Sequence, residues 1–301
     1  MVKGIIPAMV TPFDREGKIA FDKAVKLIDY VIDGGVAGIF ILGTNGEFYT
    51  IEEDEAVDYA RRVIEYVGDK VPVYVGLGSN STQQTIRYGK RMLREAGARC
   101  FTVITPFFQA LTQQELIDYY LDVANALKTP LLMYNIPART NINIAPETVG
   151  VLADNPWIIG IKDSSGNMEN LKGYLEAVKG KDFQVLCGSD SKILTALKLG
   201  AAGAVASTSN LIPRIICGIY DSFVKGDLEK AEFYQQDLEL LRLTMKLAGV
   251  PAVLKKALCL SGIDVGDPRL PVKPVSDPVI LEKIREMLKH YGLAWNPDTM
   301  V

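Results

Sequence analysis

The chain has 301 residues and a mass of 33.0 kDa, which fits either two domains or one large α/β barrel. Hydrophobic residues make up 48% and charged residues 23%, an ordinary globular composition that excludes a disordered chain or a coiled coil. The 33 basic and 36 acidic residues give a net charge of −3, so no basic excess points to nucleic acid or an anionic membrane as a partner.

The sequence contains no candidate membrane span, because no run of about 18 apolar residues occurs in it. The apolar stretch near the N-terminus is too short for a span and lacks a cleavage signal. We therefore expect a cytoplasmic protein.

Cysteine and histidine usage restricts the chemistry. The four cysteines, Cys100, Cys187, Cys217 and Cys259, are isolated and are expected to be small buried residues. The single histidine, His290, is predicted at the surface near the end of a helix. We therefore expect no metal site and no cofactor, and any general acid or base must be Tyr, Lys, Ser, Thr or a carboxylate.

Short apolar runs recur along the chain, each closed by a turn signal, at a spacing of roughly 20–35 residues, the length of a βα unit. They are apolar throughout, as expected for parallel strands buried on both faces. The eight predicted strands lie within residues 4–10, 38–43, 71–77, 100–106, 130–135, 158–163, 184–189 and 203–207.

Amphipathic helical patterns separate these runs, for example over residues 21–34, 52–68, 82–97 and 112–127. Thr82 and Thr112 are predicted to be helix N-caps. Gly34, Gly68 and Gly97 are predicted to end helices. After residue 210 the pattern is only helical, with a Pro-rich turn over residues 266–278 before a last helix.

Eight βα units in series predict a (β/α)8 TIM barrel with a C-terminal helical extension. We expect residues 1–225 to form the barrel and residues 226–301 the C-terminal helical region. An open doubly wound sheet is the alternative, but its glycine fingerprint is missing after the first strand.

In a barrel of this type the active site lies at the carboxyl ends of the strands. Lys162 closes the sixth apolar run and is expected in the barrel mouth. A lysine attacks a ketone only as the neutral amine, and desolvation favours that form. The residue is thus a candidate Schiff-base nucleophile for a keto acid. A snorkelling lysine or a partner of Asp163 is the structural alternative.

Polar residues at other strand ends complete the candidate site. Tyr134 closes the fifth run and could transfer protons to the imine, although a core tyrosine is the alternative. The turn from Gly43 to Gly46 offers backbone N–H groups and the Thr44 hydroxyl for a carboxylate. Arg139 could bind a second carboxylate or a hydroxylated tail, or could be an ordinary loop residue.

Ordered motifs over nearly the whole chain resemble the dihydrodipicolinate synthase / N-acetylneuraminate lyase superfamily. The motifs are PAMVTPF (7–13), GTNGE (43–47), YNIP (134–137), GIKD (160–163) and RLP (269–271). The resemblance implies a homotetrameric class I pyruvate-dependent aldolase, with Lys162, Tyr134 and Thr44 as catalytic residues and no metal. The predicted substrate-binding residues are Gly43, Asn45, Gly46, Arg139, Gly188 and Ala206.

Within the superfamily, the YNIPART segment around Arg139 resembles the synthase branch, which condenses pyruvate with aspartate semialdehyde. Asn45 and Phe108 depart from that branch, which has hydroxyl-bearing residues at both positions. The family's lysine-feedback site keeps Asn80 but has Phe48, Tyr49, Glu53, Ala56 and Gln84 in place of most of its expected residues. An aldolase for 2-keto-3-deoxy sugar acids is the alternative enzyme, and a non-catalytic keto-acid-binding sensor barrel is the alternative of another class.

Overall fold

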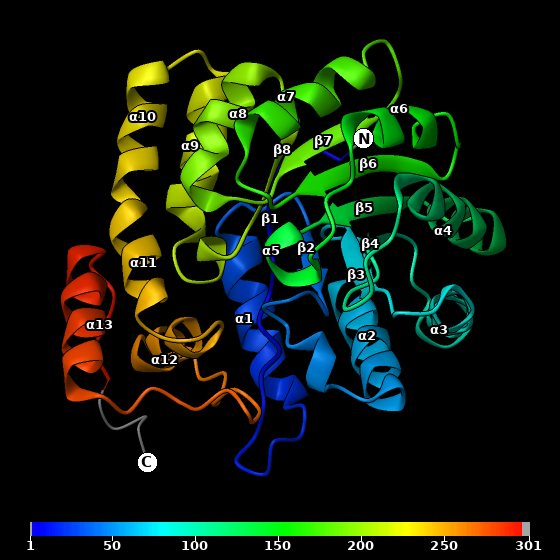
Figure 1. Ribbon diagram of the computed structural model, residues 1–301. Helices are drawn as coiled ribbons and strands as arrows, with labels where there is room; N and C mark the ends of the chain where they lie inside the picture. Colours follow the sequence, from blue (N-terminus) through cyan, green and yellow to red (C-terminus); the bar gives the residue numbers. More distant parts are fainter. Residues whose placement is uncertain (1, 297–301) are drawn as a thin grey trace.

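Eight short parallel strands form one sheet that curves into a barrel in the computed structural model, which describes residues 2–296 (Figure 1). The strands are β1 (Gly4–Pro7), β2 (Ile39–Ile41), β3 (Val73–Leu77), β4 (Phe101–Ile104), β5 (Leu131–Asn135), β6 (Ile158–Asp163), β7 (Gln184–Cys187) and β8 (Gly203–Ala206). Their order is β1-β8-β7-β6-β5-β4-β3-β2. A parallel bridge between Ala8 and Phe40 joins the two ends of this sheet. The predicted TIM barrel is therefore confirmed.

Two apolar layers explain why the strands are apolar throughout. Successive residues of a strand point to opposite faces. Leu132 therefore packs inside the barrel with Ile6 and Leu186, whereas its neighbours Leu131 and Met133 pack outward against the helices. Both faces exclude water, so neither needs polar residues.

Helices alternate with the strands around the outside of the barrel (Figure 1). They are α1 (Phe21–Asp33), α2 (Glu53–Val67), α3 (Thr82–Ala96), α4 (Gln113–Leu127), α6 (Pro146–Leu152), α7 (Met168–Ala177), α8 (Ile193–Leu199) and α9 (Pro213–Val224). The short helix α5 (Pro137–Thr140) lies instead in the loop after β5, at the barrel mouth.

The predicted helix caps are mostly confirmed. Thr112 begins α4 with a capping box. The Thr112 hydroxyl accepts a hydrogen bond from the Glu115 backbone amide, and the Glu115 carboxylate accepts one from the Thr112 backbone amide. The prediction for Thr82 is wrong, because Ser81 is the N-cap of α3 and its hydroxyl accepts from the Gln84 amide. Both residues carry a hydroxyl, and the extended backbone at Ser81 decides which one caps.

The predicted C-terminal glycines stand at the C-caps of three helices. Gly34, Gly68 and Gly97 end α1, α2 and α3 respectively. Gly97 has a φ of 71°, a left-handed conformation that favours glycine at this position.

The C-terminal extension is helical, as predicted, and its last helices stand together at one side of the barrel (Figure 1). It comprises α10 (Leu228–Asp237), α11 (Glu239–Thr244), α12 (Ala252–Leu260) and α13 (Pro278–His290). The boundary at residue 225 stays a prediction, and residues 297–301 of the predicted region lie outside the described residues.

Other predictions concern single residues. His290 ends α13 at the surface, as expected, and its Nε2 lies 2.7 Å from Asp237 Oδ1. Cys187, Cys217 and Cys259 are buried, whereas Cys100 is only partly buried. Between residues 2 and 296, no helix is long and apolar enough to cross a membrane.

Candidate active site

Lys162 lies at the carboxyl end of β6 with its amine inside the barrel mouth and is only 4% exposed. Its Nζ lies 4.0 Å from the centre of the Tyr134 ring and 5.0 Å from that of Phe40. Among the residues that the structure describes, no hydrogen bond or ion pair engages this amine. A buried amine facing aromatic rings is free to react with a small carbonyl compound.

The neighbouring Asp163 does not pair with Lys162. Its Oδ1 accepts hydrogen bonds from Asn135 Nδ2 at 2.9 Å and from the Ser165 amide at 3.1 Å. Its Oδ2 accepts from the Ser165 hydroxyl at 2.8 Å. These bonds direct the carboxylate to the opposite side of the strand, as the alternation of side chains requires.

Tyr134 lies beside Lys162 because the parallel pairing of β5 and β6 sets the two residues in register. Its side chain is 3% exposed. Its hydroxyl oxygen is 3.2 Å from Thr44 Oγ1, a hydrogen bond in which either group can donate. Three side chains from β5, β6 and the turn after β2 thus form a continuous row across the barrel mouth.

The turn from Gly43 to Gly46 is closely packed against its surroundings. A Cβ on Gly43 would lie 2.6 Å from the Phe40 ring, and one on Gly46 would lie 3.1 Å from the Leu42 amide. Thr11 Oγ1 donates to the Gly46 carbonyl oxygen at 2.7 Å, and Asn45 Nδ2 donates to the Ala8 carbonyl oxygen at 3.3 Å. A side chain at Gly43 would force the Phe40 ring to move, and one at Gly46 would be tight, so the close packing of the turn favours glycine at both positions.

A cavity of about 200 Å³ opens beside Lys162. The predicted site residues that line it are Thr44, Asn45, Tyr134, Arg139, Lys162 and Gly188. Gly43, Gly46 and Ala206 lie outside its lining. Ala206 packs outward, and the adjacent Val205 and Ser207 face the cavity in its place. The functional roles of all nine residues stay predictions.

Several lining residues were not predicted as part of the site: Ala8, Ile136, Ser164, Asp190, Val205, Ser207 and Val250. Asp190 lies three residues after the end of β7, and Ser207 directly follows β8. The sequence therefore marks both as strand-end residues but does not reveal that they pair. The Asp190 carboxylate accepts from the Ser207 hydroxyl at 3.0 Å and from the Thr208 amide at 2.8 Å. Val250 precedes α12, and no motif marks it.

Gly188 provides open space next to the reactive amine. A Cβ at this position would lie 2.0 Å from Ser164 Oγ and 3.1 Å from Lys162 Cε. Any larger residue would displace the lysine side chain or the Ser164 hydroxyl. The absence of a side chain therefore shapes the cavity.

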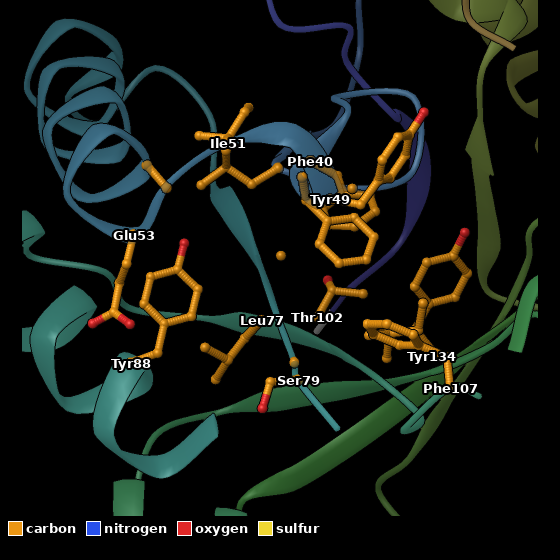
Figure 2. A pocket seen from close by; sticks show the side chains of 17 residues that line it. Phe40, Tyr49, Ile51, Glu53, Leu77, Ser79, Tyr88, Thr102, Phe107 and Tyr134 are labelled. Carbon is orange, nitrogen blue, oxygen red and sulfur yellow. The ribbon is translucent and has the colours of Figure 1, made fainter. Parts of the chain in front are cut away.

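A second cavity, of about 220 Å³, lies on the other side of Tyr134 and is largely apolar (Figure 2). Phe48, Tyr49, Glu53 and Ala56 line it, whereas Asn80 and Gln84 do not. Asn80 Oδ1 instead accepts from the Phe107 amide at 2.8 Å. The positions that correspond to the family's lysine-feedback site are thus divided between this cavity and its surroundings.

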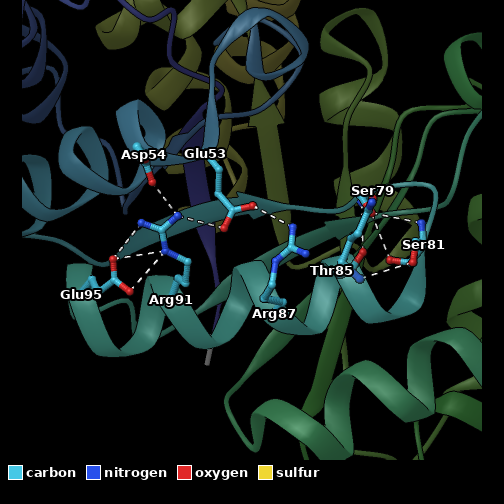
Figure 3. A network of polar contacts seen from close by, with 9 residues as sticks. Glu53, Asp54, Ser79, Ser81, Thr85, Arg87, Arg91 and Glu95 are labelled. Atoms are coloured by element: carbon cyan, nitrogen blue, oxygen red, sulfur yellow. Dashed lines mark hydrogen bonds and ion pairs between the residues drawn. The ribbon is translucent and has the colours of Figure 1, made fainter.

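Glu53 is already paired with two arginines of α3 (Figure 3). Its carboxylate lies 3.1 Å from Arg91 Nη1 and 3.4 Å from Arg87 Nη2. Arg91 also pairs with Glu95, and hydrogen bonds from Arg91 and Arg94 lower the pKa of the Glu95 carboxyl to about 2. Glu53 therefore belongs to a network that ties the start of α2 to α3.

Over residues 2–296, no group of three or more His, Cys, Asp or Glu side chains is placed to hold a metal ion.

Comparisons with known proteins agree over nearly the full length. The chain matches the model of the dihydrodipicolinate synthetase family over residues 1–291. It is 36% identical over 295 residues to a 4-hydroxy-tetrahydrodipicolinate synthase from Geobacter metallireducens. The aligned region covers 97% of this chain and 100% of that protein.

Solved structures give the same result. The dihydrodipicolinate synthase from Thermotoga maritima has a TM-score of 0.93 at 31% identity, over 97% of this chain and 99% of that one. A prophage protein of the dihydrodipicolinic acid synthase family from E. coli, in complex with pyruvate, has a TM-score of 0.92 at 32% identity, over 98% and 100% of the two chains. Because sequence and fold agree over the barrel and its C-terminal helices, the chain belongs to the dihydrodipicolinate synthetase family.

Proposed function

We propose that this protein is a Schiff-base-forming, pyruvate-dependent lyase or synthase of the dihydrodipicolinate synthase type. The observation that carries the proposal is the Lys162 amine, which is buried, unpaired among residues 2–296 and exposed to a cavity of about 200 Å³. A cavity of this size suits a three-carbon keto acid with a small aldehyde beside it. The names of the relatives and the pyruvate complex of one of them support the same substrate.

The first step is imine formation. The neutral amine of Lys162 attacks the keto carbon of pyruvate, and a C–N bond forms. The carbonyl oxygen takes up protons and leaves as water, while the nitrogen loses its protons. Tyr134 and Thr44 share a hydrogen bond and are suited to transfer these protons, because the Tyr134 side chain contacts the amine.

The second step makes the carbon–carbon bond. Loss of a methyl proton converts the imine to an enamine, whose terminal carbon attacks the aldehyde carbon of aspartate semialdehyde. The aldehyde oxygen takes up a proton and becomes a hydroxyl. The amino group of the second substrate then attacks the imine carbon, closes a ring and releases the Lys162 amine. Pyruvate and aspartate semialdehyde give 4-hydroxy-tetrahydrodipicolinate and one water.

The remaining residues bind the substrates. Thr44 and Asn45 line the cavity, so the Thr44 hydroxyl and the backbone N–H groups of this turn are suited to the pyruvate carboxylate, and Gly43 and Gly46 would shape the turn around them. The exposed Arg139 is suited to the carboxylate of the second substrate. Gly188, directly after β7, would flank the bound pyruvate, whereas the predicted Ala206 packs outward and would act only through its neighbours Val205 and Ser207.

Assembly and location are part of the same proposal. We expect a homotetramer in the cytoplasm, as the resemblance implies. Exposed apolar side chains such as Val224 and Phe233, each 63% exposed, offer surface that copies of the chain could cover. Native mass spectrometry of the full chain tests the assembly, and a monomer at all concentrations would contradict it.

The proposed chemistry is tested by trapping the imine. Pyruvate and borohydride should add one reduced adduct per chain, located at Lys162 by peptide mapping. Lys162→Ala should lose both the adduct and the activity, whereas Lys172→Ala, at an exposed position of α7, should retain both. An adduct at another lysine would overturn the site.

An aldehyde panel then identifies the second substrate. Turnover of pyruvate with aspartate semialdehyde supports the synthase reaction. Cleavage of 2-keto-3-deoxy sugar acids without that turnover would instead identify a sugar-acid aldolase. No adduct with any keto acid would leave the non-catalytic barrel as the explanation.

A further inference from the structure

The Gly43–Gly46 turn is held between two residues with left-handed backbone. Leu42 and Glu47 each have a φ of 56°. Residues with a side chain adopt this region rarely and keep it only where surrounding contacts hold it. The turn therefore needs an anchor at its ends.

Glu47 provides such an anchor through a buried charge. Its carboxylate is fully buried, and Oε1 lies 2.7 Å from Nζ of Lys255, which is also fully buried. Oε2 accepts a hydrogen bond from the Arg269 amide at 2.8 Å. Both partners come from the C-terminal extension, more than 200 residues away in the chain.

Lys255 is fixed in this position by other contacts. Its Nζ donates to the Asp267 carbonyl oxygen at 3.2 Å and lies 4.0 Å from the centre of the Phe13 ring. Burial lowers the pKa of this amine to about 8, and the Glu47 carboxylate opposes that effect. These contacts hold the Lys255 amine beside Glu47, behind the turn.

The RLP motif supports the same segment from outside. The Arg269 guanidinium donates to the Thr50 carbonyl oxygen at 2.8 Å and to the Gly17 carbonyl oxygen at 2.7 Å, and it pairs with Glu55. The C-terminal extension therefore holds the residues directly after the turn at two points.

Stability alone explains a buried ion pair poorly. Desolvation of both charges offsets most of their attraction, and well-packed apolar residues often serve as well. The location of the pair has an electrostatic consequence, however. A carboxylate directly after an anion-binding turn would repel a substrate carboxylate unless a nearby cation neutralised it.

We propose that Glu47 and Lys255 are positioning residues that keep the Gly43–Gly46 turn shaped and neutralised for the carboxylate of the keto acid. The inference rests on the function proposed above and extends it to the C-terminal helices. Neither residue contacts the cavity beside Lys162, so both act through the turn.

The test measures how borohydride trapping depends on pyruvate concentration. Lys255→Met keeps an unbranched chain and leaves the Glu47 charge unpaired. It should raise the half-saturating pyruvate concentration roughly tenfold or more, which corresponds to about 1.4 kcal/mol. The trapping rate at saturating pyruvate should stay near that of the wild type, because Lys162 and Tyr134 are intact.

The double variant distinguishes positioning from simple damage. Glu47→Gln/Lys255→Met removes both charges, and the amide oxygen of the new glutamine can still accept from the Arg269 amide. Its half-saturating pyruvate concentration should be lower than that of Lys255→Met alone, because no unpaired carboxylate remains behind the turn. If Lys255→Met does not fold, the double variant is compared with the wild type instead.

Leu258→Ala is the matched control on the same helix. Leu258 is buried and uncharged, so its truncation should lower Tm and leave the pyruvate dependence unchanged. The inference is overturned if Lys255→Met, like Leu258→Ala, changes only Tm. It is also overturned if Lys255→Met lowers the trapping rate at saturating pyruvate as much as it lowers the affinity for pyruvate. No adduct in the wild type would overturn the proposed function itself, so the two failures differ.

Discussion

The Lys162 amine lies over the face of the Tyr134 ring, at 4.0 Å from its centre, whereas the Tyr134 hydroxyl meets Thr44 at 3.2 Å. One side chain therefore makes two different contacts. Its ring lies against the amine, and its hydroxyl belongs to the polar pair that we propose transfers protons.

This division leads to a prediction for Tyr134→Phe. The variant keeps the ring and removes only the hydroxyl, so the adduct site persists while kcat falls by about 10²–10⁴-fold. Steady-state kinetics with pyruvate and the second substrate measure the change.

Tyr66→Phe is the control for that variant. The Tyr66 hydroxyl is partly buried and donates to Asp29 Oδ2 at 2.6 Å, between α2 and α1 and away from the cavity. Its loss should lower stability slightly and leave kcat nearly unchanged. Equal kinetic effects of the two variants would assign Tyr134 a packing role.

Gly188→Ala should hinder imine formation. The added Cβ would meet Ser164 Oγ at 2.0 Å and lie a tight 3.1 Å from Lys162 Cε, so the Ser164 hydroxyl must move and the lysine side chain loses room. Intact mass after borohydride and pyruvate should show little adduct. Gly150→Ala, whose Cβ would be an ordinary 3.5 Å from Ala177, should form the adduct normally. A full adduct in Gly188→Ala would show that the site accommodates the methyl group.

Arg139→Ala should affect the two substrates differently. Loss of a charge-assisted hydrogen bond costs about 1.5–3 kcal/mol, so KM for the carboxylate-bearing aldehyde should rise roughly 10- to 150-fold. Pyruvate trapping should change little. Arg285→Ala on α13, where Arg285 pairs with Glu282, is the surface control. Equal loss for both substrates would point to a structural role for Arg139.

Free lysine should inhibit weakly. The Glu53 carboxylate, which could attract an ammonium group, is already paired with Arg91 and Arg87, and the adjoining cavity is largely apolar. Initial rates with increasing lysine measure this effect, with an uncharged amino acid of similar size as the control. Strong inhibition at concentrations near the KM for pyruvate would contradict the prediction.

Thiol reagents should label the native protein slowly. Burial raises the pKa of Cys100, Cys187 and Cys217 to about 12 and also raises that of Cys259. The thiolate is the reactive form, so only a very small fraction of each thiol is reactive near neutral pH. The labelling rate should rise as the pH increases. All four thiols should react quickly in denaturant, and one fast native thiol would contradict this account.

The fold was predictable from the sequence because its signals are local. Each strand is apolar on both faces, and each helix has its own stripe and caps, so eight βα units could be counted. The site was predictable in part, since strand ends mark Lys162, Tyr134 and Thr44. Where two adjacent residues can both cap, as Ser81 and Thr82 can, only the backbone conformation decides.

Long-range pairing could not be predicted in this way. Glu47 has one of 36 acidic side chains and Lys255 one of 33 basic ones, and no spacing rule joins them. The contact between Asp190 and Ser207 likewise depends on how β7 and β8 end side by side. The sequence pattern marks each residue, and only the closed barrel brings them together.

The contact between Glu47 and Lys255 also sets an order of events during protein synthesis. A ribosome completes every strand of the barrel before it adds Lys255, and Arg269 follows later still. A nascent or truncated chain that stops at residue 225 would contain Lys162, Tyr134 and the entire Gly43–Gly46 turn, yet the Glu47 charge would lack its cation. Full affinity for the keto acid would therefore arrive only with the last quarter of the polypeptide, a section that supplies no reacting group.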